Sequence, residues 1–213
     1  KYFQYEQGCQ VPLIVRWPNQ LPAGSTSDDL VSLIDVSATT LALAGVTLPP
    51  GMHGQPFLGP NTQRREYLFT ALDRMGTKVD RVRTVRDTRY KYIRNFEPNQ
   101  PYLPPHMPYA DNTNPNFNLM RQLCAEGKLN AVQTKFMAPS RPVEELYDLQ
   151  TDPFEFNNLV ESSEHKPDLV RLRSVLEKWI VDTNDQGRTP EDPATQKREI
   201  EKLLRQMKTK FEK

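Results

Sequence analysis

The start of the chain combines one short apolar run with one helical segment. Residues 11–17 (VPLIVRW) are a continuous run of strand formers closed by Pro18. Such a run is typical of a strand buried on both faces, although a buried helix fragment has the same pattern. Residues 36–44 predict a helix, with Asp35 as N-cap and Gly45 ending it in a left-handed conformation. The order strand, loop, helix indicates the edge of an α/β layer.

The pattern changes beyond residues 47–64, which are rich in proline and glycine. Residues 66–72 predict a strand, and residues 81–94 predict a hairpin of two alternating runs that meet around Asp87. Residues 144–149 predict a further strand. We therefore expect a small antiparallel sheet in this part of the chain.

Helical spacing of apolar residues dominates the end of the chain. It predicts an amphipathic helix over residues 167–183 and a highly charged helix that opens near Pro193. Residues 119–128 predict a short helix. Residues 97–118 are rich in proline and asparagine, and a structureless loop of this length is usually functional or disordered.

Together these elements predict an α/β protein in two parts. Residues 1–64 are expected to form the C-terminal edge of a larger α/β domain, with one strand and one helix. Residues 65–213 are expected to form an α+β C-terminal subdomain with an antiparallel sheet and terminal helices. A chain of 213 residues is long enough for one domain with a core or for two small ones.

Composition narrows the possible partners. The 28 basic and 27 acidic residues leave a net charge of +1, and no basic stripe points to nucleic acid. No apolar run approaches the roughly 20 residues that a membrane span needs. The apolar fraction is only 37%, which indicates long ordered loops or a core completed by something absent. Cys9 and Cys124 lie far apart and favour two independent thiols over a disulfide.

Most catalytic patterns are missing from the sequence. The three histidines, at positions 53, 106 and 165, have no zinc-ligand spacing with one another or with a cysteine. There is no phosphate-binding glycine loop, nucleophile elbow or calcium loop. These residues alone indicate an α/β chain of unknown role.

An ordered set of segments changes this interpretation. The chain opens with K-x-x-x-Y-E-x-G-x-x-V-P, carried by Lys1, Tyr5, Glu6, Gly8, Val11 and Pro12. Four segments follow in order: LIVRWP at 13–18, DLVSLIDVSATTLALAGV at 29–46, RTVRDTRYKYIRN at 83–95 and EELYDLQTDPFEFNNL at 144–159. The set resembles the C-terminal part of a type I, formylglycine-dependent sulfatase. Gln10 stands where many members have Arg and Ala38 where they have Pro, and the stretch GCQVPLIVR is similar to the sulfamidase (heparan N-sulfatase) branch.

The resemblance implies both fold and chemistry. Residues 1–64 become the remnant of an alkaline-phosphatase-like α/β domain. The parent protein is expected to hydrolyse sulfate esters or sulfamates of a sulfated carbohydrate or glycosaminoglycan. Calcium ion and formylglycine are both expected in the missing N-terminal sulfatase domain, so this chain alone is expected to be inactive. The resemblance is compatible with a periplasmic, secreted or lysosomal protein, and the sequence does not choose between them.

Four residues are expected at the site, and none of them as a metal ligand. Lys1 is the expected catalytic residue, because a desolvated ammonium stabilises charge that develops on sulfate oxygens in the transition state. Asp73, Arg74 and His106 are expected to contact substrate, since an arginine can bind a sulfate through two hydrogen bonds. The alternatives are a solvated terminal lysine, a surface ion pair and a solvated loop histidine.

Two rival interpretations of the whole chain stay open. One is a phosphate-ester hydrolase of the alkaline-phosphatase superfamily. The other is a non-catalytic binding or interaction module whose parent has lost its active site. A C/S-x-P-x-R motif upstream in the parent protein would favour the sulfatase, and a plain Thr or Ser without it the phosphatase. A parent with neither a nucleophile nor Asp and Asn metal ligands would leave only the binding module.

Overall fold

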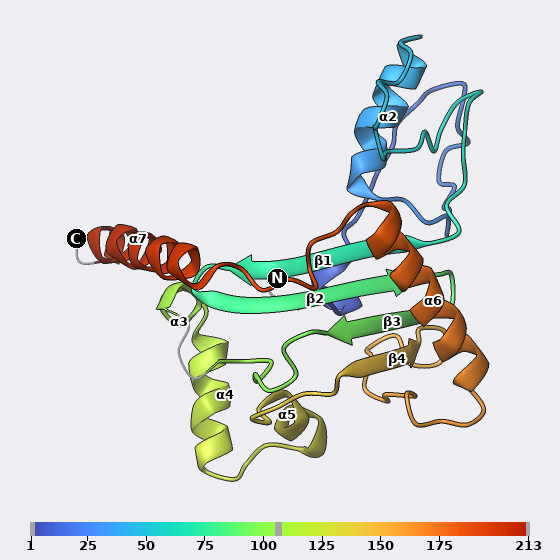
Figure 1. The fold of residues 1–213 in the computed structure, drawn as a ribbon. Coiled ribbons are helices and arrows are strands. Elements are labelled where there is room, and N and C mark those ends of the chain that lie inside the picture. The colour runs from blue at the N-terminus through green and yellow to red at the C-terminus, as the bar shows by residue number, and fades with distance from the viewer. Residues whose placement is uncertain (1–2, 105–107, 212–213) are drawn as a thin grey trace.

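A four-stranded antiparallel sheet forms the centre of the computed structural model, which describes residues 3–104 and 108–211. The strands lie in the order β1-β2-β3-β4 (Figure 1). Their bounds are Leu68–Met75, Lys78–Arg86, Tyr90–Asn95 and Glu144–Asp148. The predicted strand, hairpin and final strand are confirmed. The fold is a mixed α/β arrangement in which every strand pairs antiparallel with its neighbours.

Helices precede, interrupt and follow the sheet. Their bounds are α1 (Glu6–Cys9), α2 (Leu33–Leu43), α3 (Pro108–Thr113), α4 (Pro115–Ala125), α5 (Ala131–Phe136), α6 (Lys166–Asp182) and α7 (Pro193–Phe211). The helices predicted over 36–44, 119–128, 167–183 and from Pro193 are thus confirmed, with shifted ends. The stretch 97–118 is not structureless, because it contains α3 and the start of α4. None of the described helices has the length and hydropathy of a membrane span.

The main core lies between α6 and one face of the sheet (Figure 1). Alternation along the strands brings three side chains to this face: Val85, Tyr92 and Leu146. They pack against buried side chains that recur at helical spacing on α6, namely Leu169, Leu172, Leu176 and Ile180. The Trp179 ring stacks on Phe69, with centroids 5.0 Å apart and planes at 8°. The apolar stripe of α6 therefore has a structural role, as predicted.

The expected strand at residues 11–17 is not formed. These residues carry no regular secondary structure, and the described sheet does not include them. A strand requires a neighbour for its backbone N–H and C=O groups, and the apolar run alone does not supply one. Ile14 is 91% exposed. The division of the chain at residue 64 stays a prediction.

The start of α2 also differs from the prediction. The N-cap is Ser32 rather than Asp35, which is the third residue of the helix. Its Oδ2 atom accepts a hydrogen bond from the Ser32 N–H at 2.8 Å, which is half of a capping box. Asp35 also accepts from Arg65 at 2.7 and 2.6 Å, which fixes α2 to the loop that leads into β1. The helix ends at Leu43 with Ala44 as its C-cap, and Gly45 follows in the predicted left-handed conformation, with φ of +73°.

Removing a side chain from the main core should destabilise the protein strongly. Leu172 has no exposed surface, so Leu172→Ala is expected to lower the free energy of unfolding by about 2–5 kcal/mol. Val181 lies on the same helix and is 71% exposed, so Val181→Ala is expected to change it by less than about 0.5 kcal/mol. Denaturant unfolding of both variants measures the difference. Equal losses would show that α6 does not pack as described.

Candidate functional site

The second face of the sheet is polar and is covered by the N-terminal segment, residues 3–9. Alternation places Lys91, Ile93 and Asn95 of β3 on this face, beside Glu145 and Tyr147 of β4. A small apolar cluster of Val82, Ile93 and Tyr147 forms there, and Tyr5 packs against it. Lys91, Asn95 and Glu145 are each at most 2% exposed. We call this surface the polar face.

Glu145 fixes the Tyr5 ring of the N-terminal segment. Its carboxylate accepts hydrogen bonds from Tyr5 Oη at 2.8 Å, Tyr147 Oη at 2.6 Å and Asn95 Nδ2 at 2.6 Å. Burial and the neighbouring Glu145 carboxylate raise the pKa of Tyr5, so this phenol remains a donor across the physiological pH range. The tyrosine of the opening motif therefore anchors the chain to β4.

Glu6 forms the second anchor of the N-terminal segment, through charged hydrogen bonds. Its carboxylate accepts from Lys91 Nζ at 3.0 Å and from Arg86 Nη1. Its backbone N–H donates to Glu155 Oε2 at 2.5 Å. The Lys91 ammonium also lies 3.3 Å from Glu155 Oε1. Two strands and the loop after β4 thus hold one residue of the motif.

Gly8 permits the turn that brings the segment back on itself. The Gly8 N–H donates to the Tyr5 carbonyl at 2.8 Å. A Cβ atom at position 8 would lie 2.2 Å from the Phe3 carbonyl oxygen, a distance that side chains essentially never adopt. The glycine of the motif is therefore required by close backbone approach. Tyr5, Glu6 and Gly8 all serve to shape and anchor the segment that follows Lys1.

A buried ion cluster lies at the other end of the polar face. Asp80 has no exposed surface and accepts from Arg141 Nη1 at 2.8 Å and from Arg141 Nη2, while Lys78 Nζ lies 2.9 Å from its Oδ2. Burial alone favours a raised pKa for Asp80, but the bonds from Arg141 and the Lys78 charge outweigh it and lower the pKa. Burial lowers the pKa of Lys78, against the opposing effect of Asp80. A cavity of about 20 Å³ adjoins the cluster, enough for about one water.

An open hollow of about 930 Å³ lies between the N-terminal segment, α4, α5 and the loop after β4. Its lining is largely aromatic and includes Phe3, Phe117, Phe136, Phe154 and Phe156. Its charged lining residues are Lys135, Glu145 and Glu155. Two carboxylates and one ammonium do not favour a sulfate group, so the hollow by itself is not suited to hold the anionic end of a sulfated ligand.

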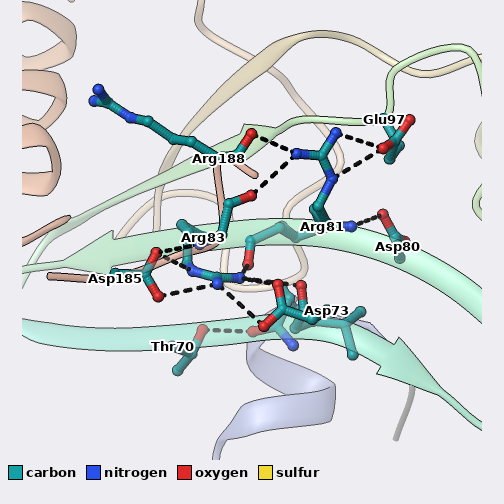
Figure 2. Close-up of polar contacts among 12 residues, drawn as sticks. Thr70, Asp73, Asp80, Arg81, Arg83, Glu97, Asp185 and Arg188 are labelled. Atoms are coloured by element: carbon teal, nitrogen blue, oxygen red, sulfur yellow. Dashed lines mark hydrogen bonds and ion pairs between the residues drawn. The ribbon is translucent and has the colours of Figure 1, made fainter. Parts of the chain in front are cut away.

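Asp73 and Arg74 lie at the irregularity where the pairing of β1 with β2 shifts register. Figure 2 shows Asp73 facing the guanidinium of Arg83, and the two side chains form an ion pair of 2.9 Å. Arg83 is 1% exposed and also binds Asp185 at 2.8 and 3.0 Å. Arg74 pairs with Glu191 at 3.1 Å. The two residues are adjacent in sequence but engage different partners, and both ion pairs lie beside the connection from α6 to α7.

Arg81 completes the attachment of this connection (Figure 2). Its guanidinium donates to Glu97 at 2.9 and 2.6 Å and to the Arg188 carbonyl at 2.7 Å. For the neighbouring Arg83, burial disfavours the charged guanidinium, but the hydrogen bonds to Asp185 and Asp73 outweigh this effect and raise the pKa of Arg83. The ion pairs account for Asp73 and Arg74 structurally. Their predicted contact with substrate stays a prediction.

The remaining predicted residues, Lys1 and His106, lie outside the described residues. Within residues 3–104 and 108–211, no group of three or more His, Cys, Asp and Glu side chains could hold a metal ion. Cys9 and Cys124 are both free. The structure therefore provides no metal site in the part of the chain that it describes.

Sequence reasoning missed Glu145 and Glu155, which bind the motif residues. Both glutamates lie in the motif segment at 144–159, which includes them in the resemblance without giving them a role. The alternation of Lys91, Ile93 and Asn95 puts an ammonium and an amide on one face of the hairpin. That signal identifies the charged face but not its partners. Glu6 and Glu155 are separated by 149 positions, and no local pattern links them.

Comparison with known proteins identifies the chain's relatives. Residues 1–103 match the family "N-sulphoglucosamine sulphohydrolase, C-terminal". An ulvan-active sulfatase of Formosa agariphila is 38% identical over 188 residues, covering 88% of this chain and 31% of the relative. Arylsulfatase G of Mus musculus is 32% identical over 97 residues, covering 43% of this chain and 18% of the relative.

One solved structure shares the fold over most of the chain. It is described as a complex with its substrate D-glucosamine-2-N,6-O-disulfate, and it matches with a TM-score of 0.58 and 23% identity over 88% of this chain and 32% of its own. The chain thus spans about a third of the length of the first ulvan-active relative. It belongs to the sulfatases, as a C-terminal region of the N-sulphoglucosamine sulphohydrolase type.

Removing the charge of Asp80 tests how much the buried ion cluster affects the free energy of unfolding. Asp80→Asn leaves Lys78 and Arg141 buried without their anion and is expected to lower the free energy of unfolding by about 3–5 kcal/mol. Asp29 pairs with Arg64 on the surface, with side chains 44% and 79% exposed, so Asp29→Asn should cost less than about 1 kcal/mol. Denaturant unfolding at neutral pH compares them.

The pH dependence of the same variants gives an independent check. The folded-state pKa of Asp80 lies below its unfolded value of about 3.9, so its stabilisation is complete above that value and is lost as pH falls through the folded pKa. The stability gap between wild type and Asp80→Asn should therefore narrow on acidification. A gap that is constant with pH would contradict the ion cluster.

Proposed function

We propose that this chain is part of an enzyme that hydrolyses sulfate esters or sulfamates of a sulfated carbohydrate. The anchoring of the N-terminal segment on the polar face carries the proposal. Tyr5, Glu6 and Gly8 of the opening motif each hold or shape the backbone that follows Lys1. Such anchoring is what a catalytic side chain needs, because transition-state stabilisation depends on a fixed position.

Lys1 is the catalytic residue of this proposal. Sulfuryl transfer places negative charge on the non-bridging oxygens and on the leaving oxygen. An ammonium directed at these atoms stabilises the transition state more than the bound substrate. Asp73, Arg74 and His106 are proposed substrate contacts, and the ion pairs of the first two would have to open to admit a ligand.

The rest of the enzyme is assigned to other parts of the parent protein. Calcium, which the family resemblance implies, has no fitting site among the described residues, and neither Cys9 nor Cys124 lies in the C/S-x-P-x-R context that formylglycine requires. The chain alone is therefore expected not to turn over substrate. Ulvan, which names the ulvan-active relatives, is the first substrate to test, and N-sulfoglucosamine is the second.

Replacing Lys1 tests the proposal in the full-length protein. Lys1→Ala is expected to lower kcat for sulfate release by about 10²–10³, comparable with removing one preorganised donor from an oxyanion site. Lys202 is a solvent-exposed lysine of α7, with a side chain 64% exposed, and Lys202→Ala should leave kcat unchanged. Sulfate released from ulvan and from N-sulfoglucosamine is measured by ion chromatography. Unchanged turnover in Lys1→Ala would end the catalytic assignment.

We propose that the apolar run at residues 11–15 forms the surface that contacts the remaining sulfatase domain. It exposes a contiguous apolar surface, with Val11 54%, Leu13 45%, Ile14 91% and Val15 42% exposed. Exposed apolar patches of this kind mark interaction surfaces. The first relatives extend far beyond the part that this chain matches, so the rest of the same protein is the nearest available partner.

A charge at Ile14 tests this interface in the full-length protein. Ile14→Asp is expected to lower the free energy of unfolding by about 3 kcal/mol or more, because it buries an unpaired carboxylate against the sulfatase domain. Asn19→Asp introduces the same charge in the adjacent exposed turn and should change stability by less than about 0.5 kcal/mol. Thermal and denaturant unfolding report both. If Ile14→Asp behaves like the control, the run stays exposed in the parent protein.

A further inference from the structure

Glu155 is a buried carboxylate in the loop between β4 and α6. Its side chain has no exposed surface. Its backbone has φ of +58°, in the left-handed region that residues with a side chain rarely adopt. Strained conformations of this kind persist where the surrounding contacts determine them. Its carboxylate contacts Glu6 of the N-terminal segment directly and through Lys91 of β3.

These contacts hold Glu6 at two points. The Glu6 N–H donates to Glu155 Oε2 at 2.5 Å, and the Glu6 carboxylate accepts from Lys91 Nζ at 3.0 Å. Lys91 in turn lies 3.3 Å from Glu155 Oε1, so one ammonium joins both carboxylates. We call Glu6, Lys91 and Glu155 the anchor triad.

The position of Glu6 makes its N–H bond important. Glu6 is the first residue of α1, so its N–H has no acceptor inside the helix. Glu6 is 7% exposed, and without Glu155 this donor would be buried away from water. A carboxylate that binds it therefore determines where α1 begins. Lys1 lies five positions before Glu6 in the sequence.

We infer that Glu155 is a positioning residue for Lys1. It fixes the start of α1 on the polar face and thereby the backbone of the residues that precede α1. This inference rests on the proposed catalytic role of Lys1. Glu155 itself touches neither substrate nor reacting atoms in this scheme, and acts through the backbone of the N-terminal segment.

Hydrogen exchange in the full-length protein tests the anchoring directly. Glu155→Ala is expected to speed amide exchange in peptides covering residues 3–9 by about tenfold or more, because the local opening free energy falls. Glu161 is an exposed glutamate of the same loop, and Glu161→Ala should leave this exchange unchanged. Glu155→Gln keeps the size and an acceptor oxygen but loses the charge, so it should give a smaller increase and covers the case in which Glu155→Ala does not fold.

Kinetics then separate positioning from general stability. On the substrate that the wild type hydrolyses, ulvan or N-sulfoglucosamine, Glu155→Ala is expected to lower kcat by about tenfold or more with KM within about twofold. In the Lys1→Ala background the same substitution should cost nothing further, because the group that it positions is gone. A purely structural role would lower the active fraction in both backgrounds equally.

The outcomes distinguish the two claims. Unchanged exchange at residues 3–9 overturns the anchoring, whatever the activity. Faster exchange with unchanged kcat, or an equal further loss in the Lys1→Ala background, overturns positioning while leaving the proposed function intact. Unchanged sulfate release in Lys1→Ala alone refutes the catalytic role of Lys1, and the exchange result then describes a structural anchor only.

Discussion

The Lys91 ammonium is buried on the polar face near the start of β3, and it requires anionic partners, one of which the start of the chain supplies. A buried ammonium without a partner costs several kcal/mol, so its carboxylates have to be present whenever the sheet is folded. They come from Glu6 and Glu155, which are 85 and 64 positions away from it in the sequence. Pairing one cation with two distant carboxylates brings three parts of the chain together. The N-terminal segment thus lies across the sheet instead of leaving it.

The two faces of the sheet have different roles: the face under α6 mainly provides stability, and the polar face mainly fixes the position of the N-terminal segment. The face under α6 is apolar, and burial of side chains such as Leu172 contributes roughly 1.5–3 kcal/mol each. The polar face contributes less net stability, because desolvation of its charges offsets their attraction. Its hydrogen bonds are directional, however, and they admit one register of the N-terminal segment. Tyr5 on Glu145 and Glu6 on Lys91 fix that register at two neighbouring residues.

Elements with a local period could be predicted from the sequence, and elements with distant partners could not. The alternating pattern of the hairpin predicts only strands, and the helical spacing of α6 predicts only a helix. The run at residues 11–17 has strand composition, but a strand requires a neighbour, and no strand of the described sheet pairs with these residues. Asp35 and Ser32 are both good capping residues, and only the backbone decides between them. Motif resemblance covered both Lys1 and Glu155, but the contact between Glu155 and Glu6 spans 149 positions, and no local pattern predicts it.

The charges around the open hollow indicate that the described residues there do not supply the positive charge that sulfate binding requires. The open hollow beside the N-terminal segment is lined by aromatic rings, two carboxylates and one ammonium, Lys135, so it does not attract a sulfate. Arg83 and Arg86 are occupied by carboxylates, and Arg74 by Glu191. In the proposed function, Arg74 would have to leave Glu191 to contact a sulfate, and Lys1 would supply further positive charge. A hollow without a surplus of positive charge is consistent with a site completed by other parts of a parent protein, since this chain spans about a third of the length of its first relative.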